Sequence, residues 1–342
     1  MNPMENHKQW PFVKEVCQTL IRNGFKAYLA GGCVRDQYLN RVPADFDIVT
    51  NAKPDEIEAL FEKTLDVGKK YGIIHVVLGS QSIEVATFRK DGLYLDGRHP
   101  ESVEFAGEWE DTARRDFTIN AMLLDMQSNQ LIDHHGGLKD LKKGIIKCVG
   151  EPLKRFSEDH LRLLRAIRFS AQLNFEISSE TWRAMYGFDT ALGSLSMERK
   201  LNEWKKIIQS PDVVGAIYLL RLLLSFLAEL CPNVHRSHHK MPPEWLLRRV
   251  SPHTEHQGAR LACLYLFNSV EELRNDMEQN RFSKGLIETI AIHQSAHHLM
   301  QSSISLGQRV EILAGEVSFY SGVILENLLK PNEKLKIKLI RR

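Results

Sequence analysis

Two aspartates one residue apart are the first feature of this sequence that could do chemistry. Asp45 and Asp47 lie in the stretch "ADFDIVT", which is typical of a β-strand, so both side chains would project from one face while Phe46 points into the core. Two carboxylates held side by side repel each other unless a cation lies between them. Mg²⁺ is normally held by one or two carboxylates together with phosphates, so the pair is a candidate metal site. An isolated Asp-x-Asp, however, is more often part of a solvated strand edge.

A glycine pair precedes the aspartates in the stretch "LAGGCVRD". Gly31 and Gly32 stand where a short strand, "KAYLA", runs into a helix that we expect to begin at Val34. Glycine lets backbone N–H groups approach an anion closely, and the helix start adds its positive end, within reach of Arg35. Taken alone, the pattern is equally compatible with a glycine turn and a surface salt bridge. A phosphate cradle and a metal pair only ten residues apart indicate a site for a nucleoside triphosphate and its metal ions.

Six motifs, in this order and spacing, resemble those of the class II CCA-adding enzymes and bacterial poly(A) polymerases of the nucleotidyltransferase superfamily. The resemblance covers about residues 25–175, and its motifs are "LAGGCVRD", "DFDIVT", "EVATFRKDG", "RRDFTINAM", "LIDHHGGLKDLKKGIIKCVG" and "EDHLRLLRAIRFSAQLNF". It implies an α+β protein, in which an N-terminal nucleotidyltransferase head of the polymerase-β-like α/β type is followed by an all-α neck, body and tail. It also implies template-independent nucleotidyl transfer from CTP and ATP to tRNA, with Mg²⁺ in a two-metal site.

The resemblance also implies roles for individual residues. Asp45 and Asp47 would hold Mg²⁺, and Glu84 of "SIEVATF" is a candidate third catalytic carboxylate, although strand alternation alone can place an acid there. The positions that would contact the nucleotide are Gly31, Gly32, Arg35, Arg115, Asp116, Asn120, Asp159, Arg162, Arg165 and Arg168. A loop, "RKDGLYLDGRHPE", would act as a lever that readjusts the pocket from C to A, and relatives that add only CC have a shortened segment here. The loop residues singled out are Asp91, Asp96 and Arg98.

Asp159 and Arg162 also suggest how a protein could select bases. Three positions apart on a helix, their side chains would project from one face. A carboxylate only accepts hydrogen bonds and a guanidinium only donates them, whereas cytosine and adenine both present an amino donor beside an acceptor nitrogen. The pair would therefore suit C and A, and would oppose U and G. A salt bridge on a solvated helix is the ordinary explanation of this spacing, and the other five motifs are what favour base selection.

An α/β framework must position these residues, and the sequence pattern predicts one. We expect helices over 11–23 and from Pro54, strands at "KAYLA", "ADFDIVT", "IIHVVLG" and "SIEVATF", and a loop over "RKDGLYLDGRHPES". After about Glu151 the pattern becomes helical almost throughout. We therefore predict a nucleotidyltransferase head at 1–150, a helical neck with the base-selecting helix at 151–210, and a helical body and tail for tRNA binding at 211–342.

Composition limits the setting in which these residues act. The 45 Lys and Arg nearly balance the 43 Asp and Glu, so any polyanion site must be local rather than the result of an overall positive field. Five widely spaced cysteines without a C-x-x-C pair argue against a disulfide framework and a zinc site, and favour a reducing cytoplasm. The most apolar run, "GAIYLLRLLLSFLAEL", is interrupted by Arg221 and predicts a buried helix rather than a membrane span.

The sequence thus implies a CCA-adding nucleotidyltransferase of the cytoplasm with tRNA as its partner, and no role for DNA, a membrane or an obligate protein partner. Three alternatives stay open. An enzyme that adds only A to tRNA would keep every motif. A poly(A) polymerase is disfavoured by the stretch "GKKYGIIHVV" and by the lack of a long basic tail. A non-catalytic RNA-binding relative would have no need of carboxylates that repel phosphate.

Overall fold

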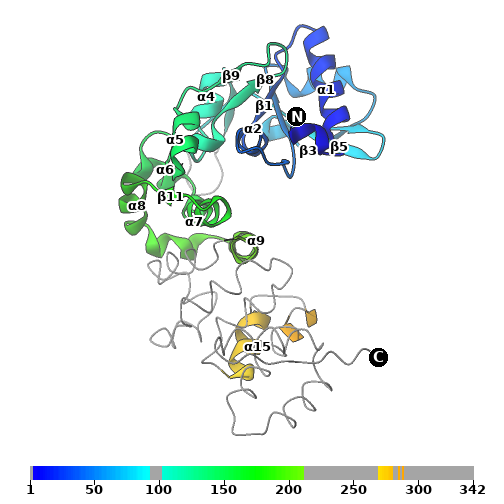
Figure 1. Cartoon of the computed structure of the whole chain (residues 1–342). Coiled ribbons are helices and arrows are strands. Elements are labelled where there is room, and N and C mark those ends of the chain that lie inside the picture. Colours follow the sequence, from blue (N-terminus) through cyan, green and yellow to red (C-terminus); the bar gives the residue numbers. More distant parts are fainter. Residues whose placement is uncertain (1–2, 93–101, 212–268, 280–283, 286, 289–342) are drawn as a thin grey trace, which may run out of the picture. The chain divides into compact units, whose positions relative to one another are not determined.

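The chain divides into two compact units in the computed structural model, which describes residues 3–92, 102–211, 269–279, 284–285 and 287–288 (Figure 1). The first unit comprises residues 1–166 and 175–188, and the second comprises residues 167–174 and 189–342. Most of the predicted body and tail, including the apolar run at 215–230, lies outside the described residues. The division into head, neck and body therefore stays a prediction.

A seven-stranded mixed sheet forms the centre of the first unit, with the strand order β3-β4-β5-β2-β1-β8-β9. Strands β2 and β5 pair in parallel, whereas the other neighbours in the sheet are antiparallel. The strands are β1 (Tyr28–Ala30), β2 (Asp47–Thr50), β3 (Thr64–Gly68), β4 (Ile73–Leu78), β5 (Gln81–Thr87), β8 (Leu123–Asp125) and β9 (Leu131–Ile132).

Helix α1 (Trp10–Arg22) packs against the strands of this sheet, as Figure 1 shows, and contacts β2 and β5. Its buried residues Val13, Val16, Cys17 and Leu20 recur at the three- and four-residue spacing of a helix that has one apolar face. The face of the sheet that carries Leu29, Ile48 and Val85 is fully buried. On the opposite face, Tyr28, Val49, Ala86 and Phe88 form an apolar cluster, and Asp47 shares that face because it lies two residues from Val49.

The first unit contains further helices and two small two-stranded sheets. They are the helices α2 (Gly32–Tyr38), α3 (Pro54–Leu60), α4 (Glu108–Ala113), α5 (Gly137–Lys143), α6 (Pro152–Glu158) and α8 (Ser179–Tyr186), the antiparallel hairpin of β6 (Arg89–Asp91) and β7 (Val103–Phe105), and the parallel pair of β10 (Ile145–Ile146) and β11 (Glu176–Ile177). Short 3₁₀ turns are η1 (Pro3–Asn6), η2 (Lys69–Tyr71) and η3 (Thr118–Asn120).

Helix α7 (Leu161–Leu173) begins in the first unit and continues into the second. The second unit also contains η4 (Asp189–Ser194), α9 (Met197–Ile208) and α15 (Val270–Gln279). Within the described ranges, no helix combines the length and the apolar character needed to span a bilayer.

The observed elements confirm most of the predicted ones and differ from the prediction in five places. The helix predicted to begin at Val34 is α2, which begins at Gly32, and the predicted loop opens with strand β6. Strand β2 begins only at Asp47, so Asp45 precedes the strand. Strand β3 was not predicted: it is a five-residue strand at the edge of the sheet, and its apolar residues Leu65 and Val67 are exposed. The neck is not wholly helical, because β11 pairs with the head strand β10.

Gly137 is the position where packing tolerates a side chain least. It opens α5, where its N–H and that of Leu138 donate to Asp133. A Cβ added at Gly137 would meet the carbonyl oxygen of Thr118 and lie 2.8 Å from Met122 Cγ. Helix α5 therefore needs glycine in order to approach η3.

We expect Gly137→Ala to lower the free energy of unfolding by about 3 kcal/mol, because the backbone of η3 must move to relieve the overlap. Gly187→Ala is the matched control, since its Cβ would meet only an ordinary 3.6 Å contact at φ −74°. Urea denaturation of both variants measures the difference, and equal stabilities would show that α5 and η3 can separate freely.

Candidate active site

Asp47 and Glu84 lie on the face of the sheet opposite Leu29, Ile48 and Val85, and the charge of Asp45 is close by. In the parallel pairing of β2 with β5, Asp47 is the register partner of Glu84, so the two side chains lie next to each other on one face. Asp45, immediately before β2, is exposed, and its charge acts on Asp47. The expected closeness of Asp45 and Asp47 is therefore found, although only Asp47 belongs to the strand.

The pKa of Asp47 records how crowded these charges are. Burial and the neighbouring charge of Glu84 raise it to about 6, with a further contribution from Asp45, while the cations Arg115 and Arg165 act in the opposite direction. Such a carboxylate at neutral pH is stabilised by an additional cation.

The carboxylate cluster suits Mg²⁺ by its chemistry. Oxygen ligands are those that Mg²⁺ prefers, and this ion usually keeps only one or two protein carboxylates and completes its shell with water and phosphate. In the described part of the chain, no three or more His, Cys, Asp or Glu side chains gather into a set that could hold a metal ion. A pair of aspartates open to phosphate oxygens therefore fits better than a closed metal cage.

Gly31 brings the backbone close to both a carboxylate and an arginine. Its φ of 72° and ψ of −127° are accessible to glycine and strained for other residues. A Cβ at this position would lie 3.2 Å from Arg115 Nη1 and 3.6 Å from Asp47 Oδ2. Gly31 therefore leaves open the space between the arginine and the carboxylate, where a phosphate would need to approach.

Asp116 holds one end of a hydrogen-bond network beside these carboxylates. Its Oδ2 accepts from Arg165 Nε at 2.7 Å, and its Oδ1 accepts from Asn120 Nδ2 at 3.2 Å. Asn120 Oδ1 in turn accepts from Arg35 Nη1 at 2.8 Å, and Arg35 Nε donates to Asp36. Burial alone would raise the pKa of Asp116, but Arg165, Asn120 and the N–H of Phe117 lower it to about 2. The network ties together α2, η3 and α7 around a carboxylate that stays ionised.

Arg35 lies deeper than the sequence suggested. The residue is 8% exposed, and its guanidinium pairs with Asp36 and Asn120. A direct contact between Arg35 and a phosphate stays a prediction, as does the contact predicted for Gly32. What the structure provides is a buried cation that orients Asn120.

Asp159 and Arg162 do not share one continuous helix, which corrects the geometry predicted from their spacing. Asp159 is the extended C-cap of α6, and its Oδ1 accepts from the N–H of Leu161, where α7 begins. Arg162 is buried and donates to Glu158 and to the carbonyl oxygens of Arg155 and Arg114. The helix is interrupted because the Asp159 side chain satisfies the start of α7 instead.

The remaining predicted site residues are Arg168 and the three loop residues. Arg168 belongs to the second unit, where its Nε lies 3.1 Å from Glu203 Oε2, and its nucleotide contact stays a prediction. Asp96 and Arg98 lie outside the described residues. Asp91, at the end of β6, pairs with Arg89 at 3.3 Å and lies 3.9 Å from an Arg114 nitrogen.

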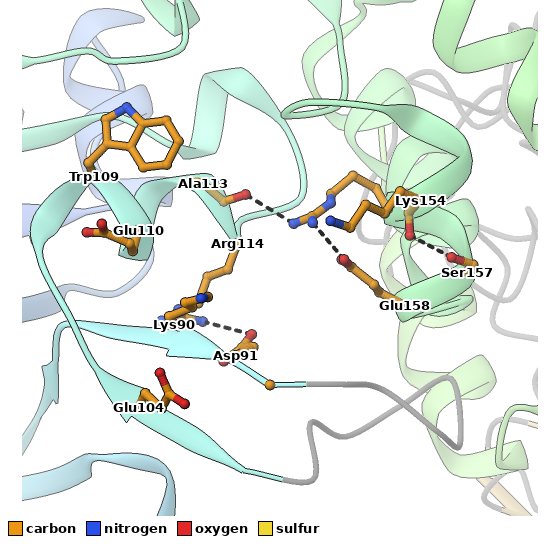
Figure 2. Close-up of a pocket in the computed structure, with 12 residues that line it drawn as sticks. Lys90, Asp91, Glu104, Trp109, Glu110, Ala113, Arg114, Lys154, Ser157 and Glu158 are labelled. Carbon is orange, nitrogen blue, oxygen red and sulfur yellow. Dashed lines mark hydrogen bonds and ion pairs between the residues drawn. The ribbon is translucent and has the colours of Figure 1, made fainter.

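A pocket of about 630 Å³ lies between the β6–β7 hairpin, α4 and α6 (Figure 2). Basic and acidic side chains both line it, and Figure 2 shows Arg114, at the end of α4, extending toward Asp91. The clustered aspartates Asp45 and Asp47 do not line this pocket. The pocket is therefore a separate cavity at the base of the hairpin.

Sequence reasoning did not identify the acids that hold the arginines in place. Asp111 pairs with Arg114 and Arg115, and Glu158 pairs with Arg155 and Arg162. The signal was present as acid-to-arginine spacings of three and four residues. Such spacings mostly occur on solvated helix faces, where a salt bridge contributes little, so they did not stand out.

Cys33 lies directly under the site. It is 2% exposed, and its Sγ donates to the carbonyl oxygen of Ala30 at 3.2 Å. Burial, and then the charge of Asp47, raise the pKa of the Cys33 thiol to about 12. Within the described residues, Cys17, Cys33 and Cys148 are buried free thiols.

Comparisons with known proteins agree with this geometry. Residues 27–147 match the family described as the poly(A) polymerase head domain. A CCA-adding enzyme of Bacillus licheniformis is 46% identical over 203 residues, which cover 59% of this chain and 50% of the relative. The chain spans about half the length of the curated relatives that it matches.

Two solved structures extend the likeness beyond the head. The Bacillus stearothermophilus CCA-adding enzyme in complex with CTP is 30% identical, with a TM-score of 0.76 over 94% of this chain and 78% of the other. A tRNA nucleotidyltransferase complexed with a primer tRNA and an incoming ATP analog is 25% identical, with a TM-score of 0.69 over 92% of this chain and 94% of the other.

In the metal-free protein, Asp47→Asn is expected to increase the free energy of unfolding by about 3 kcal/mol at pH 7.5, because it removes a crowded negative charge. The ordinary pKa is 3.8 and the folded value is about 6, so between these pH values the folded state binds a proton that the unfolded state has lost. The wild-type protein should therefore lose stability as the pH rises from about 4 to about 6, and the variant should not.

Denaturant titrations in a chelator at several pH values measure this difference. Adding Mg²⁺ at pH 7.5 should raise the stability of the wild-type protein more than that of Asp47→Asn. Parallel pH profiles for the two proteins would contradict the raised pKa.

Proposed function

The chain belongs to the family of class II CCA-adding enzymes and bacterial poly(A) polymerases, and on this premise we propose that it adds C and A to tRNA 3′ ends without a template. The observation that carries the proposal is the cluster of Asp45, Asp47 and Glu84 facing Arg115 and Arg165. Carboxylates that require a cation, beside arginines that suit phosphate, are the two halves of a nucleotidyl-transfer site. The cytoplasmic location predicted from the cysteines stays a prediction.

The proposed reaction joins the terminal ribose 3′ oxygen of tRNA to the α-phosphorus of CTP or ATP and releases diphosphate. Mg²⁺ held by Asp45 and Asp47 would supply Lewis-acid activation of the hydroxyl and neutralise the leaving group. Arg115 and Arg165 would bind the phosphates, since a guanidinium donates two parallel hydrogen bonds to such oxygens. Gly31 lets the phosphates approach, and Asp116 and Asn120 would orient the ribose. Glu84 is the candidate third carboxylate.

Base choice would depend on Asp159 and Arg162. Arg162 uses three of its five N–H donors to bind Glu158 and two carbonyl oxygens, so two donors are left for a base. Those fixed bonds hold the guanidinium in one orientation. A rigid donor beside a carboxylate acceptor would match C and A and leave U and G with unpaired polar groups.

Replacing either metal-binding aspartate should abolish transfer without unfolding the protein. We expect Asp45→Ala and Asp47→Ala to lower kcat by at least about 1,000-fold, because the metal loses a carboxylate ligand. Incorporation of labelled nucleotide into tRNA gives the rate, and circular dichroism gives the fold. If Asp45→Ala kept the wild-type kcat, the assignment of Asp45 as a metal ligand would be wrong.

Asp159→Ala should relax base selection while leaving chemistry in place. We expect discrimination against UTP to fall by about tenfold or more, because the acceptor that pairs with the amino group of C and A is lost. The ratio of kcat/KM for CTP to that for UTP is the measurement. Unchanged discrimination would refute the role of Asp159, even if overall activity fell.

The reaction itself is tested with tRNA transcripts that end at the discriminator base, at C, at CC or at CCA. Each is incubated with Mg²⁺ and CTP, ATP or both, and products are resolved at single-nucleotide length. Growth of the bare end to CCA followed by arrest is the expected result. Extension of CC by A alone would indicate an A-adding enzyme, unlimited A-tailing a poly(A) polymerase, and no extension a non-catalytic RNA-binding relative.

A further inference from the structure

Asp111 is a carboxylate without any exposed surface near the end of α4. It accepts from Arg114 Nη2 at 2.7 Å and from Arg115 Nη2 at 3.0 Å. Although burial acts to raise the pKa of Asp111, Arg115 and Arg114 hold it below its usual value. A single buried negative charge is thus shared by two neighbouring arginines.

The two arginines point to different places. Arg114 extends to the hairpin, where its Nη1 lies 3.9 Å from Asp91 Oδ2, as Figure 2 shows. Arg115 faces the catalytic cluster, since its Nη1 would lie 3.2 Å from a Cβ on Gly31, close to Asp47 Oδ2. Of these two neighbouring arginines, Arg115 is therefore the one in position to meet a phosphate beside Asp47.

Arg115 depends on Asp111 for its orientation. Within the described residues, the bond to Asp111 is the one hydrogen bond that holds the Arg115 side chain, and its buried Nε has no hydrogen-bond partner. An arginine side chain has several rotatable bonds and loses rotamer freedom when it is fixed. A charge-assisted bond to a buried carboxylate is strong enough to offset that loss.

We propose that Asp111 is a positioning residue that holds the Arg115 guanidinium at Gly31 and Asp47 for the triphosphate of the incoming nucleotide. The inference rests on the proposed function, because it assumes that the site receives a nucleoside triphosphate. Since Asp111 acts on the phosphates and not on the base, its loss weakens binding of CTP and ATP by the same factor. Discrimination against UTP is unaffected.

The test begins with Asp111→Asn, which keeps the side-chain volume and removes the charge. KM for CTP and for ATP should each rise about tenfold, the range expected for one charge-assisted hydrogen bond, with a smaller change in kcat. Binding of labelled CTP without tRNA, measured by equilibrium dialysis, should weaken by the same factor. An unchanged KM in a folded Asp111→Asn protein overturns the proposal.

A double-mutant cycle tests whether Asp111 acts through Arg115. Asp111→Asn should weaken CTP binding in the wild-type background and add nothing to Arg115→Met. Effects that multiply would show that Asp111 acts by another route and would overturn the proposal. Asp140→Asn is the structural control, because Asp140 is a carboxylate of the same unit that bonds Thr118 and not an arginine, and its KM should equal that of the wild type.

A charge-balanced pair covers the case in which Asp111→Asn does not fold. Removing Arg114 together with Asp111 leaves fewer unpaired buried charges than removing Asp111 alone. Asp111→Asn/Arg114→Met should then bind CTP about tenfold more weakly than Arg114→Met, and equal binding overturns the proposal. A wild-type protein that transfers no nucleotide would instead refute the proposed function.

Discussion

Repulsion among Asp45, Asp47 and Glu84 is the constraint around which the described part of the head is arranged. The parallel pairing of β2 with β5 makes Asp47 and Glu84 neighbours, and burial strengthens their mutual effect. The positive charges of Arg115 and Arg165 partly compensate these carboxylates, and each arginine is itself paired with a buried acid. The site is therefore built as successive layers of opposite charge.

The acids that pair with the arginines, Asp111 and Asp116, orient neighbouring groups as well as balance charge. Asp116 does not merely balance Arg165, because it also fixes the Asn120 amide, which accepts from Arg35. Each of these groups has its partners set by geometry, so the orientation of one constrains the next. Groups held in this way need little rearrangement when a charged substrate binds, which is the electrostatic preorganisation that phosphoryl chemistry depends on.

The sequence alone predicted those features of the site that follow from residues close together along the chain. Asp45, Asp47 and Gly31 stand out because strand alternation and glycine turns are local rules, and the structure places Asp47 close to Gly31 and within the influence of the Asp45 charge. The contact between Asp47 and Glu84 depends on strand register, which no local pattern specifies. For Asp159 a local pattern predicted the wrong geometry. Its spacing from Arg162 is that of neighbours on one helix, yet Asp159 is the C-cap of α6 and its side chain accepts from the N–H of Leu161, where α7 begins. Asp111 escaped notice because burial, and not spacing, separates it from an ordinary surface salt bridge.

The thiol of Cys33 gives this catalytic core a built-in reporter. Because burial raises the pKa of Cys33 to about 12 and leaves only 2% of the residue exposed, Cys33 presents almost no reactive thiolate in the folded state. A thiol reagent could modify Cys33 only during excursions in which α2 separates from the sheet. The rate at which Cys33 is modified would then report the free energy of that local opening, with no substrate present. The same cysteine that lines the floor of the site thus makes the rigidity of the site measurable by chemistry.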